Sequence, residues 1–237
     1  MQIVTLSIDR AGKATTPNVL KNCLVAIPES QSKEYAKTID PKRLLLIPDE
    51  LTTPYDSLIE KPISKHKARN WIREQVDEDW LVMIDDNLSC LRRTYVGKDG
   101  QETKITSGEE IEDILKFSCY ASNMSDCKMF GFAESYKTSD YDPFKPISLT
   151  GYIPSTCFGI HKSNRIIFQK DWLEGHWITG MNAHHHKICW IDKRFNFKMK
   201  QTVHPTITSE QWTELELAFG KNAITRTKAG ELNKMNI

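Results

Sequence analysis

The sequence predicts an α/β fold built on a mixed, mostly parallel sheet that is flanked by helices. Three observations favour this class. Four short apolar runs recur in the first half of the chain, polar or proline-containing sequence follows each of them directly, and a segment of helical character separates the third from the fourth. Buried parallel strands have this pattern, with functional loops at their carboxyl ends.

The four runs are the predicted first strands. They occupy residues 3–8, 23–27, 44–47 and 80–84. The segment 64–76 contains no Gly or Pro and places Ala68, Trp71 and Ile72 at helical spacing behind Ser64, a residue type that caps helices. We therefore expect a crossover helix between the third and fourth strands.

A second helix is predicted to begin after Ser107. Ser107 and Glu110 match a capping box, and Ile111, Ile114 and Leu115 form one apolar face. The pattern further predicts strands at residues 129–133, 152–160 and 195–199, a polar loop at 135–146 and a helix at 209–219. A loop of that length is often functional.

Length and charge limit the class of protein. The chain has 237 residues, a length that one continuous core can serve, so we expect a single domain over residues 1–220 and a basic tail over 221–237. Thirty-two basic and thirty-one acidic residues give a formal net charge of +1. That balance does not indicate an obligate nucleic-acid coat or a membrane-surface protein, although local patches are still allowed.

Cysteine usage predicts a reducing, cytoplasmic location. The six cysteines are widely spaced, form no CxxC pair and follow no secretory leader. No apolar run approaches the ~20 residues that a membrane span needs. An enzyme that modifies secreted glycans would normally carry such a segment, so we expect an intracellular acceptor.

An acidic cluster follows the fourth predicted strand. Asp85, Asp86 and Asn87 come directly after the apolar run 80–84, at the strand end where open α/β sheets form their ligand crevice. Adjacent carboxylates repel each other unless a cation lies near them. Mg²⁺ or Mn²⁺, held together with diphosphate oxygens, would relieve this repulsion. The alternative is a solvated turn or a helix cap.

The wider context makes this cluster more specific. Arg69 and Asn70 follow a small residue on the predicted crossover helix, and Asn70 precedes Asp85 by fifteen positions (85 − 70 = 15). This combination resembles GT-A glycosyltransferases of the broad family 2 type, in which Arg-Asn lies on the helix before the strand that carries an Asp-x-Asp motif. The resemblance implies a Rossmann-like GT-A fold and a nucleotide-sugar donor such as a UDP-sugar.

The resemblance also implies roles for individual residues. Asp85 would face the nucleotide and the metal, Asn87 would occupy the second acidic position, and Lys67, Arg69 and Asn70 would border the donor pocket. Asn87 departs from the motif, because an amide oxygen binds a hard cation more weakly than a carboxylate does. Asn87 thus leaves the dependence on a metal open, unless Asp86 takes over part of the metal binding.

The loops after the first three predicted strands complete the expected donor site. Ser7, Arg10 and Lys13 follow the first strand, where GT-A enzymes hold the nucleoside and diphosphate, and the two cations suit phosphates. Glu29 and Asp49 follow the second and third strands, where hydrogen bonds to the base or ribose are expected. Each acid could equally be a solvated side chain.

Glu174 is the first candidate for the catalytic base, at a place where GT-A enzymes commonly carry an acid, and His176 is the second. An inverting transfer needs such a group to accept the proton of the attacking hydroxyl. The alternative for Glu174 is an ordinary acid at a helix start. His204 is a candidate metal ligand, because some GT-A enzymes complete the metal sphere with a downstream His.

The layout also resembles the TET-associated glycosyltransferases of phages, which add sugars to hydroxymethylated pyrimidines in DNA. Cations that could contact DNA phosphates are Arg92, Arg93, Lys98, Lys104, Lys162, Arg165 and those of the tail. Tyr152, Phe158 and Trp177 could pack against an extruded base. The transferred sugar would be a hexose or a pentose. Two alternatives remain: a cytoplasmic glycosyltransferase that acts on a glycan precursor, or a non-catalytic nucleotide- or DNA-binding module.

Overall fold

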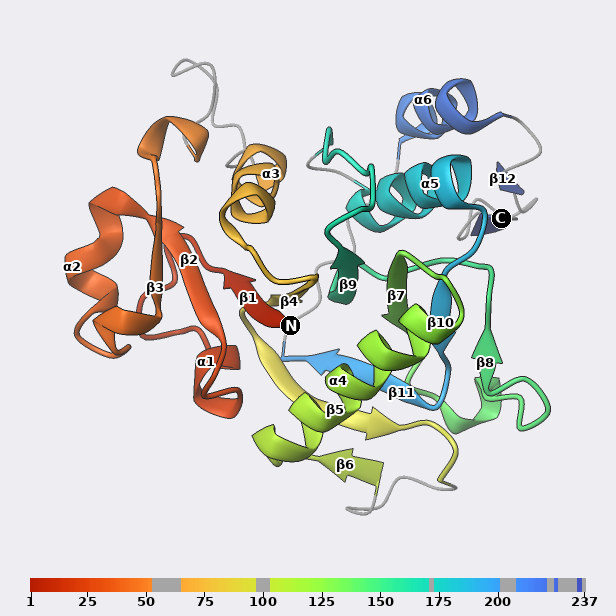
Figure 1. The fold of residues 1–237 in the computed structure, drawn as a ribbon, viewed down its shortest axis with the longest axis horizontal. Coiled ribbons are helices and arrows are strands. Elements are labelled where there is room, and N and C mark those ends of the chain that lie inside the picture. Colours follow the sequence, from red (N-terminus) through yellow and green to blue (C-terminus); the bar gives the residue numbers. More distant parts are fainter. Residues whose placement is uncertain are drawn as a thin grey trace.

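The computed structural model describes residues 1–52, 65–96, 103–170, 173–200 and 208–220, together with the backbone of residues 224–225 and 234–235. Within these ranges the chain forms one large sheet, a smaller sheet beneath it and helices on both sides (Figure 1). None of the helices in these ranges is long and apolar enough to cross a membrane.

An eight-stranded sheet runs through the molecule in the order β3-β2-β1-β4-β9-β7-β10-β8. Its strands are β1 (Gln2–Leu6), β2 (Leu24–Pro28), β3 (Leu44–Ile47), β4 (Trp80–Asp85), β7 (Met129–Phe132), β8 (Ile147–Ser148), β9 (Cys157–His161) and β10 (Trp190–Asp192). The first four are parallel neighbours. Strands β7 and β10 run in the same direction, while β8 and β9 run against it. The predicted mixed, mostly parallel sheet is confirmed.

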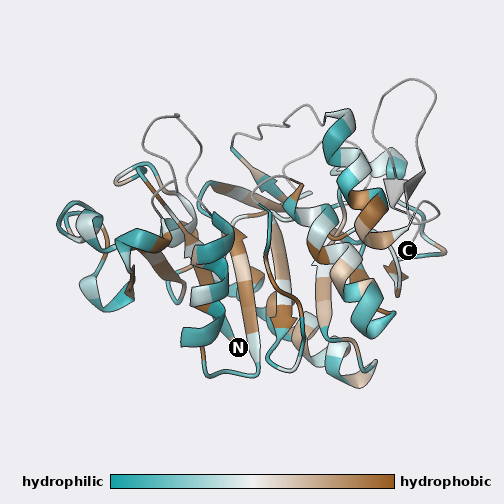
Figure 2. Ribbon diagram, turned by 90° about the horizontal axis from the view of Figure 1, so that it is seen from above, coloured by the Kyte–Doolittle hydropathy of each residue, from teal (hydrophilic) through white to brown (hydrophobic). Residues whose placement is uncertain are grey.

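Alternate residues of β4 supply two hydrophobic cores on opposite faces of this sheet. Val82 and Ile84 pack with Leu115 of α4 (Gly108–Met124), whereas Met83 packs with Ala68 of α3 (Lys65–Gln75) and Ile178 of α5 (Glu174–His186). Because side chains alternate along a strand, both faces of a central strand must be apolar. Figure 2 shows central strands coloured mostly as hydrophobic, next to helices that carry both hydrophilic and hydrophobic residues.

A three-stranded antiparallel sheet continues the chain beyond the acidic cluster. A tight turn at Asp86 and Asn87 leads from β4 into β5 (Leu88–Arg93), which pairs with β11 (Phe195–Met199) and with β6 (Lys104–Ile105). The end of β4 therefore lies where the two sheets meet.

Shorter elements complete the fold. They are α1 (Thr16–Val19), α2 (Ser32–Tyr35), α6 (Ser209–Phe219), β12 (Ile224–Thr225), β13 (Lys234–Met235) and the 3₁₀ turns η1 (Glu29–Gln31), η2 (Pro41–Arg43), η3 (Asp49–Leu51) and η5 (Thr138–Asp140). Helix α6 has a full capping box at Thr208 and packs on α5 through Trp212 and Trp177. The two short strands β12 and β13 pair within the predicted tail.

Most predicted elements are found within one or two residues of their expected bounds. The strand predicted at 152–160 is wrong in its first part, since β9 begins only at Cys157. Pro154 has no N–H for a ladder, and the N–H of Ile153 donates to Thr179 Oγ1 at 2.9 Å. The predicted cap Ser64 lies outside the described residues. Ser107 caps α4 as predicted, accepting a hydrogen bond from the N–H of Glu110.

Candidate functional site

The carboxyl ends of β1 and β4 are tied together through Asp86. Its buried carboxylate accepts a hydrogen bond of 2.7 Å from Ser7 Oγ and forms an ion pair of 2.8 Å with Arg10 Nε. Its backbone carbonyl accepts the N–H groups of Thr15 and Thr16. A buried carboxylate is stable only with such partners. Asp86 thus fixes the loop after β1 against the strand end that carries Asp85.

Tyr35 on α2 supports the same loop from the other side. The fully buried hydroxyl lies 2.8 Å from Ser7 Oγ and accepts the N–H of Arg10 at 3.1 Å. The side-chain amide of Gln31 accepts a hydrogen bond from the N–H of Asp9 and donates one to the Asp9 carboxylate. Asp9 itself has a φ of 56°, a strained conformation typical of functional loops. Sequence reasoning missed Tyr35 and Gln31, because nothing in their local pattern indicates this contact.

Arg69 connects the acidic strand end to the proposed base. Its guanidinium is buried, with Nη2 3.6 Å from Asp85 Oδ1 and Nε 2.5 Å from Glu174 Oε1. The contact with Glu174 is an ion pair without hydrogen-bond alignment at Nε. Nη1 also contacts Met83 Sδ at 3.3 Å, and the guanidinium lies over the ring of Phe158. Two residues 89 positions apart (174 − 85 = 89) therefore share one buried cation.

Asp85 keeps part of its carboxylate accessible. Its side chain is 39% exposed, whereas that of Asp86 is 10% exposed. Desolvation raises the pKa of Asp85, and the positive charge of Arg69 opposes this rise. A partly desolvated carboxylate at a strand end is a group that gains from a nearby cation.

A cationic pocket of about 360 Å³ lies beside this cluster. It is lined by Arg10, Lys13, Thr15, Asn87 and Lys200. Lys200 reaches the pocket because its N–H donates to the carbonyl of Asn87 at 2.8 Å, directly after β11. Three cations and no acid among the lining residues suit an anion such as a diphosphate. Lys200 was not predicted, since its partner lies more than a hundred residues earlier.

The described residues fit a metal ion only in part. Asp85 and Asn87 offer oxygen atoms, but Asp86 is already held by Ser7 and Arg10. Among the described residues, no group of three or more His, Cys, Asp or Glu side chains could hold a metal. Mg²⁺ commonly takes one or two carboxylates and fills its other positions with water and substrate phosphates, so Asp85 suits such an arrangement. His204 lies outside the described residues.

The start of α5 carries the first candidate for the catalytic base. Glu174 is the first residue of this helix, and its side chain is 13% exposed. Leu173 before it has a φ of 50°, a strained conformation for a leucine. Burial raises the pKa of Tyr152, and the charges of Glu134 and Glu174 both raise it further. The charges of both carboxylates thus reach one tyrosine, and Glu134 is a candidate base that the sequence did not suggest.

His176, the second candidate base, is buried within the α5–α6 contact. Its ring centroid is 4.6 Å from that of Tyr152 and 5.3 Å from that of Trp212. Burial lowers the pKa of His176 to about 4. It is therefore neutral near pH 7 and a weak proton acceptor, and the geometry favours Glu174.

Four further residues were predicted to border the donor site. Asn70 donates to the carbonyl of Phe168 and accepts its N–H, so its amide holds the segment before α5. Asp49 accepts two hydrogen bonds from Ser30. Glu29 is exposed at the start of η1, and Lys67 is half-buried on α3. Their roles toward a nucleotide stay predictions.

Two of the aromatic residues predicted to pack against a base cannot do so. Phe158 is fully buried beneath Arg69, and Trp177 is buried against α6. Lys162 pairs with Asp79 at the amino end of β4, opposite the end that carries Asp85. Six residues of strand separate these ends by about 17–20 Å.

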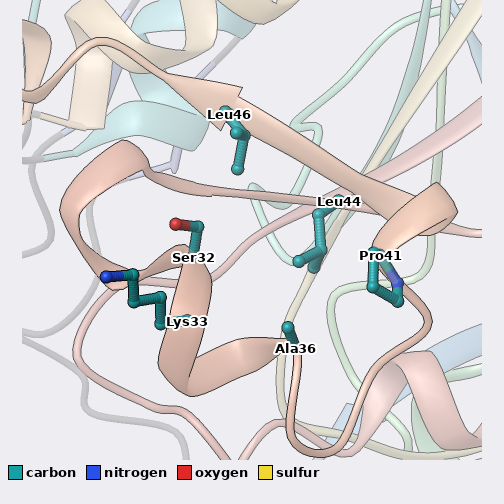
Figure 3. Close-up of a pocket in the computed structure, with 6 residues that line it drawn as sticks. All are labelled: Ser32, Lys33, Ala36, Pro41, Leu44 and Leu46. Carbon is teal, nitrogen blue, oxygen red and sulfur yellow. The ribbon is translucent and has the colours of Figure 1, made fainter.

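A second pocket, of about 250 Å³, lies at the edge of the large sheet (Figure 3). Its lining is formed by Ser32, Lys33, Ala36, Pro41, Leu44 and Leu46. The pocket contains no carboxylate, and β3 is separated from β4 by two strands. It lies apart from the cluster at the end of β4.

The comparison of folds is decisive for the architecture. The structure of S. aureus TarS residues 1–349 in complex with UDP-GlcNAc matches this chain with a TM-score of 0.52 and 13% sequence identity, and TarS has a GT-A glycosyltransferase fold. The chain has the GT-A fold. The match covers 92% of this chain and 65% of the TarS chain.

The chain therefore spans about two thirds of the length of the structure it matches. A second structure of TarS 1–349 has 12% identity, a TM-score of 0.49 and coverage of 92% and 64%. No protein-family model matches the sequence, and no curated protein sequence matches it either.

Proposed function

We propose that this protein is a glycosyltransferase that transfers a sugar from a UDP-sugar to a hydroxyl acceptor. The observation that carries the proposal is the meeting of a cationic pocket, the partly exposed Asp85 and the Arg69–Glu174 pair at one end of the sheet. In open α/β folds this end of the sheet forms the ligand crevice. We further propose that residues 1–220 act as one catalytic domain and 221–237 as its basic tail.

The donor diphosphate would lie in the pocket of Arg10, Lys13 and Lys200. Lysine and arginine side chains suit phosphate oxygens, and charge-assisted hydrogen bonds are among the strongest polar contacts in proteins. The UDP-GlcNAc in the TarS complex supports a uridine diphosphate donor. Asp85 and Asn87 would hold a Mg²⁺ or Mn²⁺ ion beside the diphosphate, where the ion would neutralise the charge of the leaving group.

Glu174 would act as the general base in an inverting transfer. The acceptor oxygen attacks the anomeric carbon, the bond from that carbon to the diphosphate oxygen breaks, and the proton of the acceptor hydroxyl passes to the carboxylate of Glu174. UDP then leaves. Arg69 would position this carboxylate, and Asp86 would position the loop after β1.

The proposed acceptor is a 5-hydroxymethylpyrimidine in DNA, with a cytoplasmic glycan precursor as the alternative. A net charge of +1 is compatible with both, and the basic residues of the small sheet favour a polyanion. A cytoplasmic location is supported by the six cysteines, all within the described residues, which are buried free thiols.

A donor-turnover assay tests the proposed function. Incubated with Mn²⁺ and a panel of UDP-sugars, with or without hydroxymethylcytosine DNA, the wild type is expected to release UDP. Asp85→Ala is expected to abolish turnover and to keep the melting temperature, because the partly exposed Asp85 adds little to the core. Wild-type rates in Asp85→Ala would refute the site. Absent turnover in the wild type, with unchanged DNA affinity in the variant, would favour a binding module.

A further inference from the structure

We infer that the outer side of the small sheet binds the phosphate backbone of a nucleic acid, with Tyr136 stacking on a base. This side, called here the basic face, is defined by Arg92, Lys104, Tyr136, Lys198 and Lys200. The inference rests on the proposed function for its acceptor, and it assigns the surface that would hold that acceptor.

The strand pairing places the cations of the basic face side by side. Leu91 and Phe197 point into the core that α4 covers, so their neighbours Arg92 and Lys198 lie on the opposite side of the sheet. Arg92 is directly opposite Lys104 of β6. Three strands, which are labelled in Figure 1, thus contribute one cation each to one side of the sheet.

Tyr136 joins two of these cations. Its ring centroid lies 5.1 Å from the Arg92 guanidinium carbon and 5.3 Å from Lys198 Nζ. The tyrosine nevertheless keeps 46% of its surface exposed. Arg92 is only 7% exposed, so it supports the ring, and the accessible cations beside the ring are Lys198 and Lys104. An exposed aromatic ring beside accessible cations offers a stacking surface and phosphate contacts together, as in proteins that bind single-stranded nucleic acids.

The basic face leads into the proposed donor pocket. Lys198 and the exposed Lys200 are two positions apart at the end of β11, and Lys200 lines the pocket together with Arg10 and Lys13. A strand of nucleic acid along β11 would therefore bring one of its bases close to the place where a sugar is expected.

The structure favours this surface over the other predicted cations. Arg93 lies on the core side, where it pairs with Glu110 of α4. Lys162 pairs with Asp79 at the far end of β4. Phosphates bound at Arg93 would lie on the core side of the small sheet, and phosphates bound at Lys162 would lie at the opposite end of β4 from the pocket.

Fluorescence anisotropy with a labelled single-stranded DNA of about 20 nucleotides tests the inference. Lys104→Glu and Lys198→Glu are expected to weaken binding about tenfold at low salt, and each should lower the slope of log Kobs against log salt by about one. Tyr136→Ala should weaken binding about tenfold, and Tyr136→Phe should restore it. Lys116→Glu, on α4, and Lys162→Glu are matched controls that should bind like the wild type.

Inorganic polyphosphate serves as a second probe without bases. Loss of polyphosphate binding in Lys198→Glu but not in Tyr136→Ala supports stacking. If Tyr136→Ala changes DNA binding no more than the controls do, the surface binds polyanions in general and the nucleic-acid assignment is overturned. Effects of Lys162→Glu as large as those of Lys104→Glu would overturn the surface itself.

UDP release measured in the same variants separates this inference from the proposed function. Lys104→Glu and Tyr136→Ala should retain the donor hydrolysis of the wild type, because neither residue lines the pocket. If the wild type turns over the donor but none of the variants alters DNA binding, the proposed surface is wrong and the proposed function stands. If the variants alter DNA binding but the wild type does not turn over any donor, the proposed function is wrong and the proposed surface stands.

Discussion

Glu174→Gln is expected to lower kcat by about 10²- to 10⁴-fold, the range typical of losing a general base. The amide keeps the shape of the side chain but cannot accept the proton of the acceptor hydroxyl. Glu174 begins α5 and lies 2.5 Å from the buried Arg69, so the exchange removes charge at a fixed position. Steady-state kinetics with UDP-sugar and acceptor would measure this loss, while the affinity for UDP should change little.

Glu134→Gln is the matched control for this prediction. The charges of Glu134 and Glu174 both raise the pKa of Tyr152, but Glu134 is exposed on the loop after β7 and does not start a helix. We expect its kcat to stay within a few-fold of the wild type. A large loss in Glu134→Gln with a small one in Glu174→Gln would reassign the base to Glu134.

Arg69→Met is expected to lower the free energy of unfolding by about 3–5 kcal/mol, as is usual when one partner of a buried ion pair is removed. The guanidinium side chain is 5% exposed and lies between Asp85 and Glu174. Its removal leaves the largely buried Glu174 without its cation, whereas Asp85 can still reach solvent. Urea denaturation would measure the change.

A double variant separates ion pairing from the loss of packing on Phe158. Arg69→Met combined with Glu174→Gln should lose less stability than the sum of the single losses, because the unpaired charge is gone. Additive losses, or a loss below about 1 kcal/mol in Arg69→Met, would contradict a structural role for this pair.

Local sequence patterns were sufficient for the elements that carry the site. The apolar run before Asp85 and the loop with Arg10 each predicted their own strand ends, and parallel strands bring such ends to one edge of a sheet. The meeting of Asp86 with Ser7 and Arg10 follows from that arrangement.

Contacts between distant segments were not predictable in the same way. Strand β5 has too few apolar residues to be recognised alone, and its partner β11 lies about a hundred residues later. Lys200, Tyr35 and Tyr136 reach the site or its border only through such pairings and packing. Their side chains look like ordinary surface or core residues in the sequence.

The burial of His176 shows a related limit. Its position two residues after Glu174 made it a second candidate base, but helical geometry turns it toward Trp212 and the α5–α6 contact. Where a side chain points depends on where the helix begins and on what packs against it, and neither was visible in the sequence.

Calorimetric titration with UDP tests most directly the central claim that the pocket beside Asp85 binds a nucleoside diphosphate. The wild type should bind UDP, and Lys13→Ala and Lys200→Ala should each bind it about tenfold more weakly, as expected when a charge-assisted contact to phosphate is lost. Lys21→Ala, an exposed lysine outside the pocket, should bind like the wild type. Equal UDP affinity in all four proteins, or none in the wild type, would contradict the account.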